Sequence, residues 1–328
     1  MTERRLNVSD YTVGWVCALP VELAAAMEML DEEHEPLPQD PGDSNSYVFG
    51  RIGEHNLVIV CLPAGQMGTN SAATVTTQMR ARFGSIRFGL MVGIGGGVPS
   101  AECDIRLGDV VISQPHTQYG GVVQYDFRKV GLGGRFTRIG SLNAPPMALL
   151  TALSRLQSNF IRGKSKITEF LPSLRHIPGF KYPGEDYDVL FKSAYDHAGG
   201  LTCENCNKAE EVRRLPRDSN NPSLHFGTIA SGNQIIKDAA TRDQLSAELG
   251  GILCFEMEAA GLMNNFPCLV IRGICDYADS HKNKRWQSYA AATAAACAKD
   301  LLGIIPVSQL AGMTPAGAGN AGRNPNTN

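Results

Sequence analysis

The segment GLMVGIGGGV, residues 89–98, is an apolar run that ends in a cluster of glycines. Its first half has the composition of a buried β-strand. Glycine carries no side chain, so backbone N–H groups within such a cluster can approach a ligand closely. A plain tight turn is the alternative, because glycine is common in turns. The segment therefore predicts a buried strand that ends in a ligand-binding loop or a turn.

Strand-like runs alternate with helical patterns on both sides of this segment. The strand-like runs are 11–19, 57–62, 225–230 and 268–274, and the helical patterns are 21–30, 70–83, 239–249 and 286–302. Such alternation is typical of a mostly parallel sheet covered by helices. We therefore expect an α/β fold with a mostly parallel, mixed central sheet.

Three stretches depart from this alternation. Residues 1–10 are charged and polar, and we expect a short N-terminal extension there. Residues 159–223 mix charges with several prolines and lack sustained periodicity, which predicts an insertion within one domain that spans residues 11–305. Residues 306–328 contain few bulky apolar side chains and cannot offset the entropy cost of ordering, so we expect a disordered tail or a linker.

Composition excludes several classes of protein. With 30 basic and 32 acidic residues, the chain has no charge excess that would favour nucleic acid. No apolar run is long enough to span a membrane, so we expect neither a membrane nor a nucleic-acid partner. Several of the nine cysteines lie inside apolar runs, which is typical of reduced thiols and favours a cytoplasmic location.

The glycine cluster does not fit a dinucleotide-binding fingerprint. That fingerprint requires a helix that opens on the last glycine and an acidic residue about 20 positions later. Here Pro99 follows almost at once, and residues 107–112 begin another strand-like run. The sequence therefore argues against a nicotinamide cofactor.

Carboxylates follow the strand-like runs. Glu22 comes just after the first run, Glu256 and Glu258 follow the short run near residue 254, and Asp276 is the first acidic residue after 268–274. The carboxyl ends of strands in an open α/β sheet face a ligand crevice, so these side chains are expected to converge. A glutamate that merely favours the positive end of a helix is the alternative for Glu22 and Glu258.

Taken together, these motifs resemble the nucleoside phosphorylase and nucleosidase superfamily, that is, purine and uridine phosphorylase family 1. The matching segments resemble those of methylthioadenosine/adenosylhomocysteine nucleosidases and are residues 18–22, 93–97, 107–112, 230–233, 255–259 and 272–276. The resemblance covers about residues 11–302 apart from the insertion, and it implies a three-layer α/β/α fold. The overall sequence pattern most resembles that of fungal nucleoside-phosphorylase-like domains, which often lie at the N-terminus of NLR-type proteins of innate immunity.

The resemblance implies a role for each carboxylate. Asp276 matches the family's acid at N7 of the purine, and Glu22 occupies the position that activates water in nucleosidases. Glu258 matches the glutamate that holds the ribose hydroxyls, and Met257 matches the methionine that packs on the sugar. A free aspartic acid has a pKa of about 3.9, so an acid role at neutral pH requires a raised pKa. The other positions that we expect to bind substrate are Gly95, Gly96, Gly97, Ser231, Asn233, Phe255 and Glu256.

Hydrolysis is expected rather than phosphorolysis. Phosphorylases of this superfamily carry an arginine in the early loop, whereas residues 20–23 contain none, and Ile94 stands where many relatives have a hydroxyl. A purine nucleoside phosphorylase that uses inorganic phosphate is the alternative enzyme. A non-catalytic nucleotide-sensing or oligomerisation module is the alternative of another class.

The expected substrate is a purine nucleotide or nucleoside. Residues 231–235 lack the aspartate and the aromatic side chain of bacterial nucleosidases, so base specificity depends mainly on Asp276. Related immune-type domains include ATP nucleosidases, which favours ATP or another adenine nucleotide, with an uncharged nucleoside as the alternative. Basic residues that could meet a phosphate chain, or simply be solvated, are Arg128, Lys129, Arg135, Arg138, Lys282, Lys284 and Arg285. Relatives form dimers, trimers or hexamers, so we expect a homo-oligomer.

The insertion contains a C-x-x-C pair, Cys203 and Cys206, with His197 six residues ahead of the first cysteine. Tetrahedral zinc needs four ligands, and His225 or a carboxylate could complete the set. Free thiols on a loop are the alternative. We expect no cofactor for catalysis, so any zinc would be structural.

Overall fold

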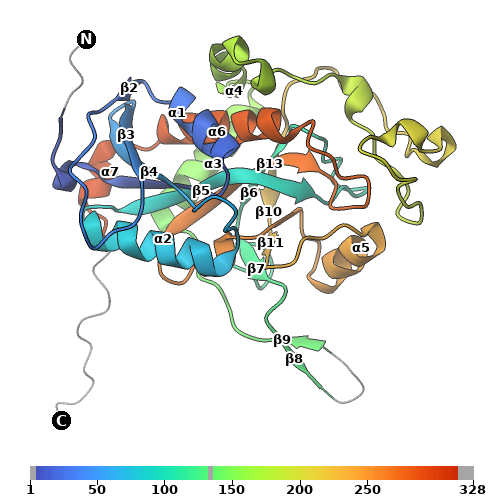
Figure 1. The fold of residues 1–328 in the computed structure, drawn as a ribbon, viewed down its shortest axis with the longest axis horizontal. Coiled ribbons are helices and arrows are strands. Elements are labelled where there is room, and N and C mark those ends of the chain that lie inside the picture. Colours follow the sequence, from blue (N-terminus) through green and yellow to red (C-terminus); the bar gives the residue numbers. More distant parts are fainter. Residues whose placement is uncertain (1–4, 132–135, 317–328) are drawn as a thin grey trace.

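A mostly parallel β-sheet with helices on both faces forms the body of the protein (Figure 1). The computed structural model describes residues 5–131 and 136–316. The strands are β1 (Val13–Cys17), β2 (Glu32–Glu33), β3 (Tyr47–Ile52), β4 (His55–Cys61), β5 (Phe88–Gly97), β6 (Val110–Ser113), β7 (Val122–Gln124), β8 (Arg128–Val130), β9 (Phe136–Arg138), β10 (Leu224–Gly227), β11 (Ile229–Ser231), β12 (Cys254–Glu256) and β13 (Cys268–Asp276). The α-helices are α1 (Pro20–Glu28), α2 (Thr69–Arg82), α3 (Met147–Ile161), α4 (Ile167–Phe170), α5 (Ala239–Glu248), α6 (Gln287–Leu302) and α7 (Val307–Ala311).

The sheet confirms the expected α/β fold. Its main path runs β10-β6-β13-β5-β1-β4-β3-β2, with β7, β11 and β12 attached beside it. The central pairs β1–β4, β1–β5 and β13–β5 are parallel, whereas β13–β6 and β12–β5 are antiparallel. Every residue of β1 and β13 is buried, as expected for strands covered on both faces.

Alternate side chains of the central strands enter two different cores. Trp15 and Cys17 pack with α1, α3 and α6 on one face, whereas Val16 packs with α2 on the other. Figure 1 shows α1 and α6 on one side of the sheet and α2 on the opposite side. The architecture is therefore a three-layer α/β/α fold, as the resemblance implied.

The glycine cluster is neither a loop nor a turn, so the expected local structure was wrong, whereas its contact with a ligand stays a prediction. Residues 93–97 continue β5, where they pair with β13 on one side and, near the end, with β12 on the other. A Cβ atom at Gly96 would lie 2.9 Å from an oxygen of Asp276 and from Cβ of Ala278. Glycine is therefore needed here because neighbouring side chains approach the strand closely, and the N–H groups of the strand are not a bare cradle.

The predicted insertion consists of short helices and loops, of which α4 packs near α6 on one face of the molecule and the later part extends past one end of the sheet (Figure 1). After α3 and α4 come the 3₁₀ helices η3 (Leu171–His176), η4 (Pro178–Phe180), η5 (Glu185–Tyr187), η6 (Cys203–Asn205) and η7 (Lys208–Glu210). Two further 3₁₀ helices are η1 (Val8–Asp10) and η8 (Ala259–Gly261). The hairpin β8–β9 projects away from the body of the molecule (Figure 1).

The first part of the predicted disordered tail is folded. Residues 307–311 form α7, where Leu310 is 2% exposed, and the N–H of Ala316 donates to the carbonyl of Ile86 at 2.7 Å. The expectation was wrong for residues 306–316 because their few apolar side chains find places in the two cores. Residues 317–328 lie outside the described residues. Among those described, no helix is both long and apolar enough to span a bilayer.

The packing of α6 on β13 predicts one strongly destabilising substitution. A Cβ atom at Gly273 would overlap the backbone carbonyl of Ala290 in α6. We expect Gly273→Ala to lower the free energy of unfolding by about 3 kcal/mol, because overpacking against backbone cannot be relieved by a rotamer change. Urea unfolding measures this loss. Gly84→Ala is the matched control, since a Cβ atom there meets nothing within 4 Å, and equal stability of the two variants would contradict the packing argument.

Candidate active site

A cavity of about 180 Å³ lies where the carboxyl ends of β1, β5 and β13 meet β12. Nine of the predicted site residues line it: Glu22, Gly95, Gly96, Phe255, Glu256, Met257, Glu258, Asp276 and Lys282. They come from segments far apart in the sequence. The expected convergence of strand ends therefore occurs.

Glu22 lies in the first turn of α1 and is 4% exposed. One carboxylate oxygen accepts hydrogen bonds from the N–H groups of Ala18 and Leu19, at 2.7 and 3.0 Å, and the other accepts from Ile94 at 2.8 Å. It therefore caps α1, as the structural alternative expected, and also reaches the cavity. Burial raises the pKa of Glu22 against the opposing effects of Arg272 and these donors, which makes the carboxylate a better proton acceptor.

Arg272, in the matching segment 272–276, has a role that the sequence did not predict. It is fully buried on β13, and its guanidinium bonds Glu256 and lies 3.4 Å from an oxygen of Glu258. Its charge also acts on Glu22. One cation therefore serves three buried carboxylates. The signal was available in the sequence, because Arg272 is the one charged residue in the apolar run 268–275.

Two glutamates on either side of Met257 have different surroundings. Glu256 accepts hydrogen bonds from the N–H groups of Glu258 and Ala259, at 3.1 and 3.0 Å, so it anchors the turn that begins η8. Glu258 accepts from the N–H of Gly68 at 3.2 Å. Burial raises the pKa of Glu258 to about 7, and the nearby carboxylates add to the effect while Arg272 opposes it. Glu258 therefore holds a proton more readily than an exposed glutamate does.

Asp276 is 4% exposed and forms an ion pair that the sequence did not predict. Its Oδ2 lies 2.9 Å from Nζ of Lys282 and accepts the thiol of Cys275, while its Oδ1 accepts from the N–H of Ala278 at 2.9 Å. Ala278 has a φ of 52°, a strained conformation for a residue with a side chain. The carboxylate that was expected to act as the acid at the base therefore lies in a buried network with an ammonium, a thiol and a backbone N–H group.

Four predicted residues do not line the cavity. Gly97 pairs with Cys254 in the sheet, and the hydroxyl of Ser231 accepts the N–H of Ala260. Asn233 accepts the N–H of Thr69 at 3.0 Å, next to the Gly68 that donates to Glu258. Ser231 and Asn233 therefore support the turns around Glu258 rather than contact the cavity.

Arg128 is the fourth, and it lies on the projecting hairpin, where its Nε donates to the carbonyl of Tyr125. Lys129 and Arg138 lie on the same hairpin, with Arg138 4.9 Å above the ring of Tyr119. Arg135 lies outside the described residues. The expected set of basic residues is thus divided between the hairpin and the loop after Asp276.

Part of the cavity wall was not predicted. Met67, Gln234, Ile235, Ile236 and Gln287 line it together with Ala18 and Leu19. Ile235 is 51% exposed despite its size. Several of them lie in segments that the sequence analysis singled out, but apolar and amide side chains gave no sign of which of them would line the cavity.

Comparison with known proteins agrees with this geometry. Residues 12–305 match the family described as the phosphorylase superfamily. A nucleotide-binding leucine-rich repeat (NLR)-like protein of Hyaloscypha variabilis is 50% identical over 92% of this chain, which spans only 30% of that protein's length. A 5'-methylthioadenosine/S-adenosylhomocysteine nucleosidase of Mycobacterium tuberculosis is 27% identical, over 90% of this chain and 97% of its own.

A more distant relative carries a different substrate in its name. The ATP nucleosidase Cap17 of Escherichia coli is 24% identical over 87% of this chain, which covers half of that protein. Among solved structures, the methylthioadenosine/adenosylhomocysteine nucleosidase of Neisseria meningitidis superposes with a TM-score of 0.58 at 16% identity, over 89% of this chain and 98% of its own. At this level of identity, the structural likeness shows a shared fold.

The raised pKa of Glu258 predicts how stability depends on pH. Its folded-state pKa of about 7 lies above the usual 4.5, so the folded protein holds this proton more tightly than the unfolded chain. The free energy of unfolding should therefore fall as pH rises from about 4.5 to 7, by up to about 3 kcal/mol from this group. Urea unfolding at several pH values in this window measures the slope.

Glu258→Gln should remove that contribution, whereas Glu54→Gln, at an exposed position, should keep it. Comparing the two variants isolates Glu258 from the other groups that titrate in this range. An identical pH slope in the wild type and in Glu258→Gln would contradict the assignment.

Proposed function

The chain belongs to the phosphorylase superfamily, and on that premise we propose that it is an N-ribosyl hydrolase that cleaves a purine base from its ribose. The convergence of Glu22, Glu258 and Asp276 on one cavity carries the proposal. Breaking this bond leaves positive charge on the ribose and negative charge on the departing purine, so the two parts of the substrate need different surroundings. The cavity offers a proton donor for the base and negative charge for the ribose.

The base is proposed to meet Asp276 and Lys282. Asp276 acts as the acid at N7, and the ammonium of Lys282, 2.9 Å from its Oδ2, supplies the proton that the carboxylate passes on. Although burial alone would lower the pKa of Lys282, Asp276 raises it on balance, so the proton is present at neutral pH. The proton moves as the glycosidic bond breaks, because N7 becomes more basic while the purine takes up the bonding electrons.

The ribose is proposed to lie against Glu258 and Met257. An oxygen of Glu258 can accept the sugar hydroxyls, and Met257 offers an apolar surface at the cavity wall. Glu22, Glu256 and Glu258 surround this region with more negative charge than Arg272 alone can neutralise. Such an environment favours a sugar that becomes cationic in the transition state.

Water is the proposed nucleophile, and Glu22 takes its proton as it attacks the anomeric carbon. Phosphate would need cationic donors. Among the described residues that line the cavity, Lys282 is the basic side chain, and it is already paired with Asp276. This charge pattern supports hydrolysis over phosphorolysis.

ATP or another adenine nucleotide is the proposed substrate. The relationship to an ATP nucleosidase supports this choice. The hairpin that carries Arg128, Lys129 and Arg138 projects from the body, so in a homo-oligomer it could bring basic side chains to the phosphate chain at a neighbouring copy's cavity (Figure 1). The cavity wall formed by Ala18, Met67 and Ile235 is apolar and instead favours an uncharged nucleoside, which is the second candidate.

Product chromatography separates these candidates. Purified protein is incubated with ATP, AMP, adenosine or methylthioadenosine, each with and without inorganic phosphate. We expect adenine from ATP without phosphate, together with ribose triphosphate. Adenine from uncharged nucleosides alone would select the second candidate, ribose 1-phosphate formed only with phosphate would contradict hydrolysis, and binding without any release would support a non-catalytic module.

Variants of the carboxylates test the assigned roles. Asp276→Asn and Glu22→Gln should each slow adenine release by about 10²- to 10⁴-fold, the usual contribution of a general acid or base. Asp218→Asn and Glu54→Gln, at exposed positions, are the matched controls and should retain the wild-type rate. A wild-type rate in either active-site variant would remove that residue from the mechanism.

A further inference from the structure

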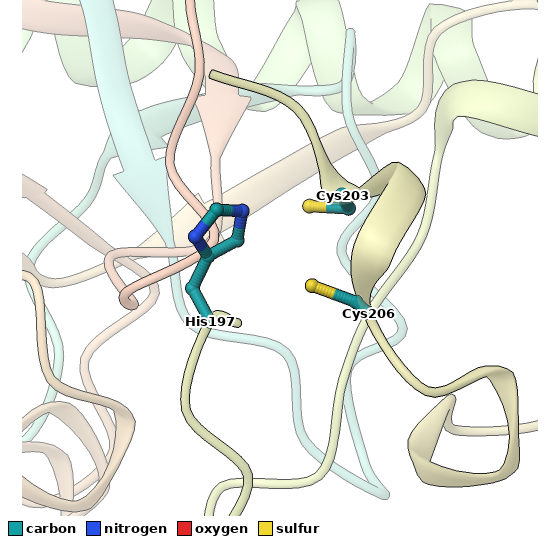
Figure 2. A group of neighbouring side chains, drawn as sticks. All are labelled: His197, Cys203 and Cys206. Carbon is teal, nitrogen blue, oxygen red and sulfur yellow. The ribbon is translucent and has the colours of Figure 1, made fainter. Parts of the chain in front are cut away.

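The insertion brings three metal-binding side chains together. The ligand atoms of His197, Cys203 and Cys206 all lie within 4.8 Å of one another. Figure 2 shows both sulfur atoms turned toward the ring of His197. Cys203 begins η6, a single 3₁₀ turn, and Cys206 follows its last residue, so this turn holds both sulfurs on the same side (Figure 2). The three residues that are close in the sequence are therefore also clustered in the folded protein.

We propose that His197, Cys203 and Cys206 bind a zinc ion that fastens the insertion to the loop carrying Lys282. Two thiolates and an imidazole are the donors that tetrahedral zinc prefers, at about 2.3 Å from sulfur and about 2.0 Å from nitrogen. One ion can reach all three ligand atoms with small side-chain movements, given their present separation. The site is structural and does not depend on the proposed hydrolase activity.

The ring nitrogens of His197 can give up one of their present hydrogen bonds to bind zinc. Its Nδ1 accepts the N–H of Gly199 at 3.0 Å, and its Nε2 lies 3.1 Å from the carbonyl of Thr202. Zinc at either nitrogen replaces one of these contacts, and the other continues to orient the ring. Binding also releases the thiol protons of Cys203 and Cys206, so the site should bind zinc more tightly as pH rises.

The fourth ligand is not the His225 that the sequence suggested. The ring of His225 faces Asp109 and Cys103, at 2.9 and 3.2 Å, in a different network. His281 is the better candidate, because its ring centre lies 5.5 Å from that of His197 and it is 7% exposed. In the part of the chain that the structure describes, neither of its ring nitrogens has a hydrogen-bond partner. Its ring now stacks on Phe191, and it would turn from there to reach the ion.

An ion at this place would join two segments that meet next to the cavity. The N–H of His197 donates to the hydroxyl of Ser280 at 3.0 Å, and the thiol of Cys203 lies 3.9 Å from the carbonyl of His281. Lys282 is the next residue, and it pairs with Asp276. The zinc site therefore braces the loop whose lysine reaches the cavity.

Metal content is the direct test. Untagged full-length protein is stripped with a chelator under reducing conditions, reloaded with zinc and freed of excess metal, and its zinc is then counted by mass spectrometry. We expect one zinc per chain in the wild type and less than about a tenth of that in Cys203→Ser with Cys206→Ser, because a structural site needs its thiolates. Cys61→Ser, at a partly buried cysteine elsewhere, is the matched control and should retain the zinc.

A wild-type protein that holds no zinc after reduction and reloading would overturn the proposal. Equal zinc in the double variant would also overturn it, because the metal would then bind elsewhere. If the double variant does not fold, the wild-type protein is instead loaded with cobalt and its visible absorption spectrum is recorded. Strong visible bands of tetrahedral cobalt with a thiolate charge-transfer band would support the site, and their absence would contradict it.

Two further readouts test the geometry. Zinc removal should increase hydrogen exchange in residues 195–211 and 277–283 but not in β4, and unchanged exchange in both segments would contradict the bracing role. His281→Ala should weaken zinc binding by at least about tenfold, as loss of one ligand does, and unchanged affinity would remove His281 from the site.

Discussion

The site depends on the ion pairs that the fully buried guanidinium of Arg272 forms with neighbouring glutamates. The guanidinium bonds Glu256, lies 3.4 Å from Glu258 and acts on Glu22, so it holds three carboxylates from two separate segments around one point of the sheet. Without this cation the three acids would repel one another in a medium that screens charge poorly, and the protein could retain them only in protonated form. Arg272 opposes the rise that burial causes in the pKa values of Glu22 and Glu258, and the pKa of Glu258 still rises to about 7. The same arrangement supplies the negative field that the cationic ribose of the proposed reaction requires.

The glycines of β5 make this cluster sterically possible. A Cβ atom at Gly93 would overlap the carboxylate of Glu22 and the guanidinium of Arg272, and one at Gly96 would lie 2.9 Å from Asp276. Because these positions of the strand carry no side chains, the side chains of neighbouring elements can approach its backbone closely. The hydrogen bond from the N–H of Ile94 to Glu22 then fixes one carboxylate directly to this strand. Fold and site are specified by the same short segment.

The alternation of apolar runs and helical patterns was enough to predict the α/β sheet, and the acidic residues after those runs were enough to predict that Glu22, Glu258 and Asp276 meet. The glycine segment was misread because periodicity cannot distinguish a strand from a loop when side chains are absent. The ion pair of Asp276 with Lys282 was missed because it closes a turn through Ala278, whose positive φ has no sequence signal. Leu310 illustrates the same limit, since the composition of this polar stretch did not show that its few apolar side chains would be buried in the cores.

The central claim is that this cavity holds a purine with its N7 toward Asp276 and its ribose toward Glu258. A crystal structure of the protein with adenine and ribose tests that claim most directly. The account predicts adenine in the cavity with N7 within hydrogen-bonding distance of the Asp276–Lys282 pair, and a ribose hydroxyl on Glu258. Adenine bound outside the cavity, or oriented with N7 away from Asp276, would contradict it.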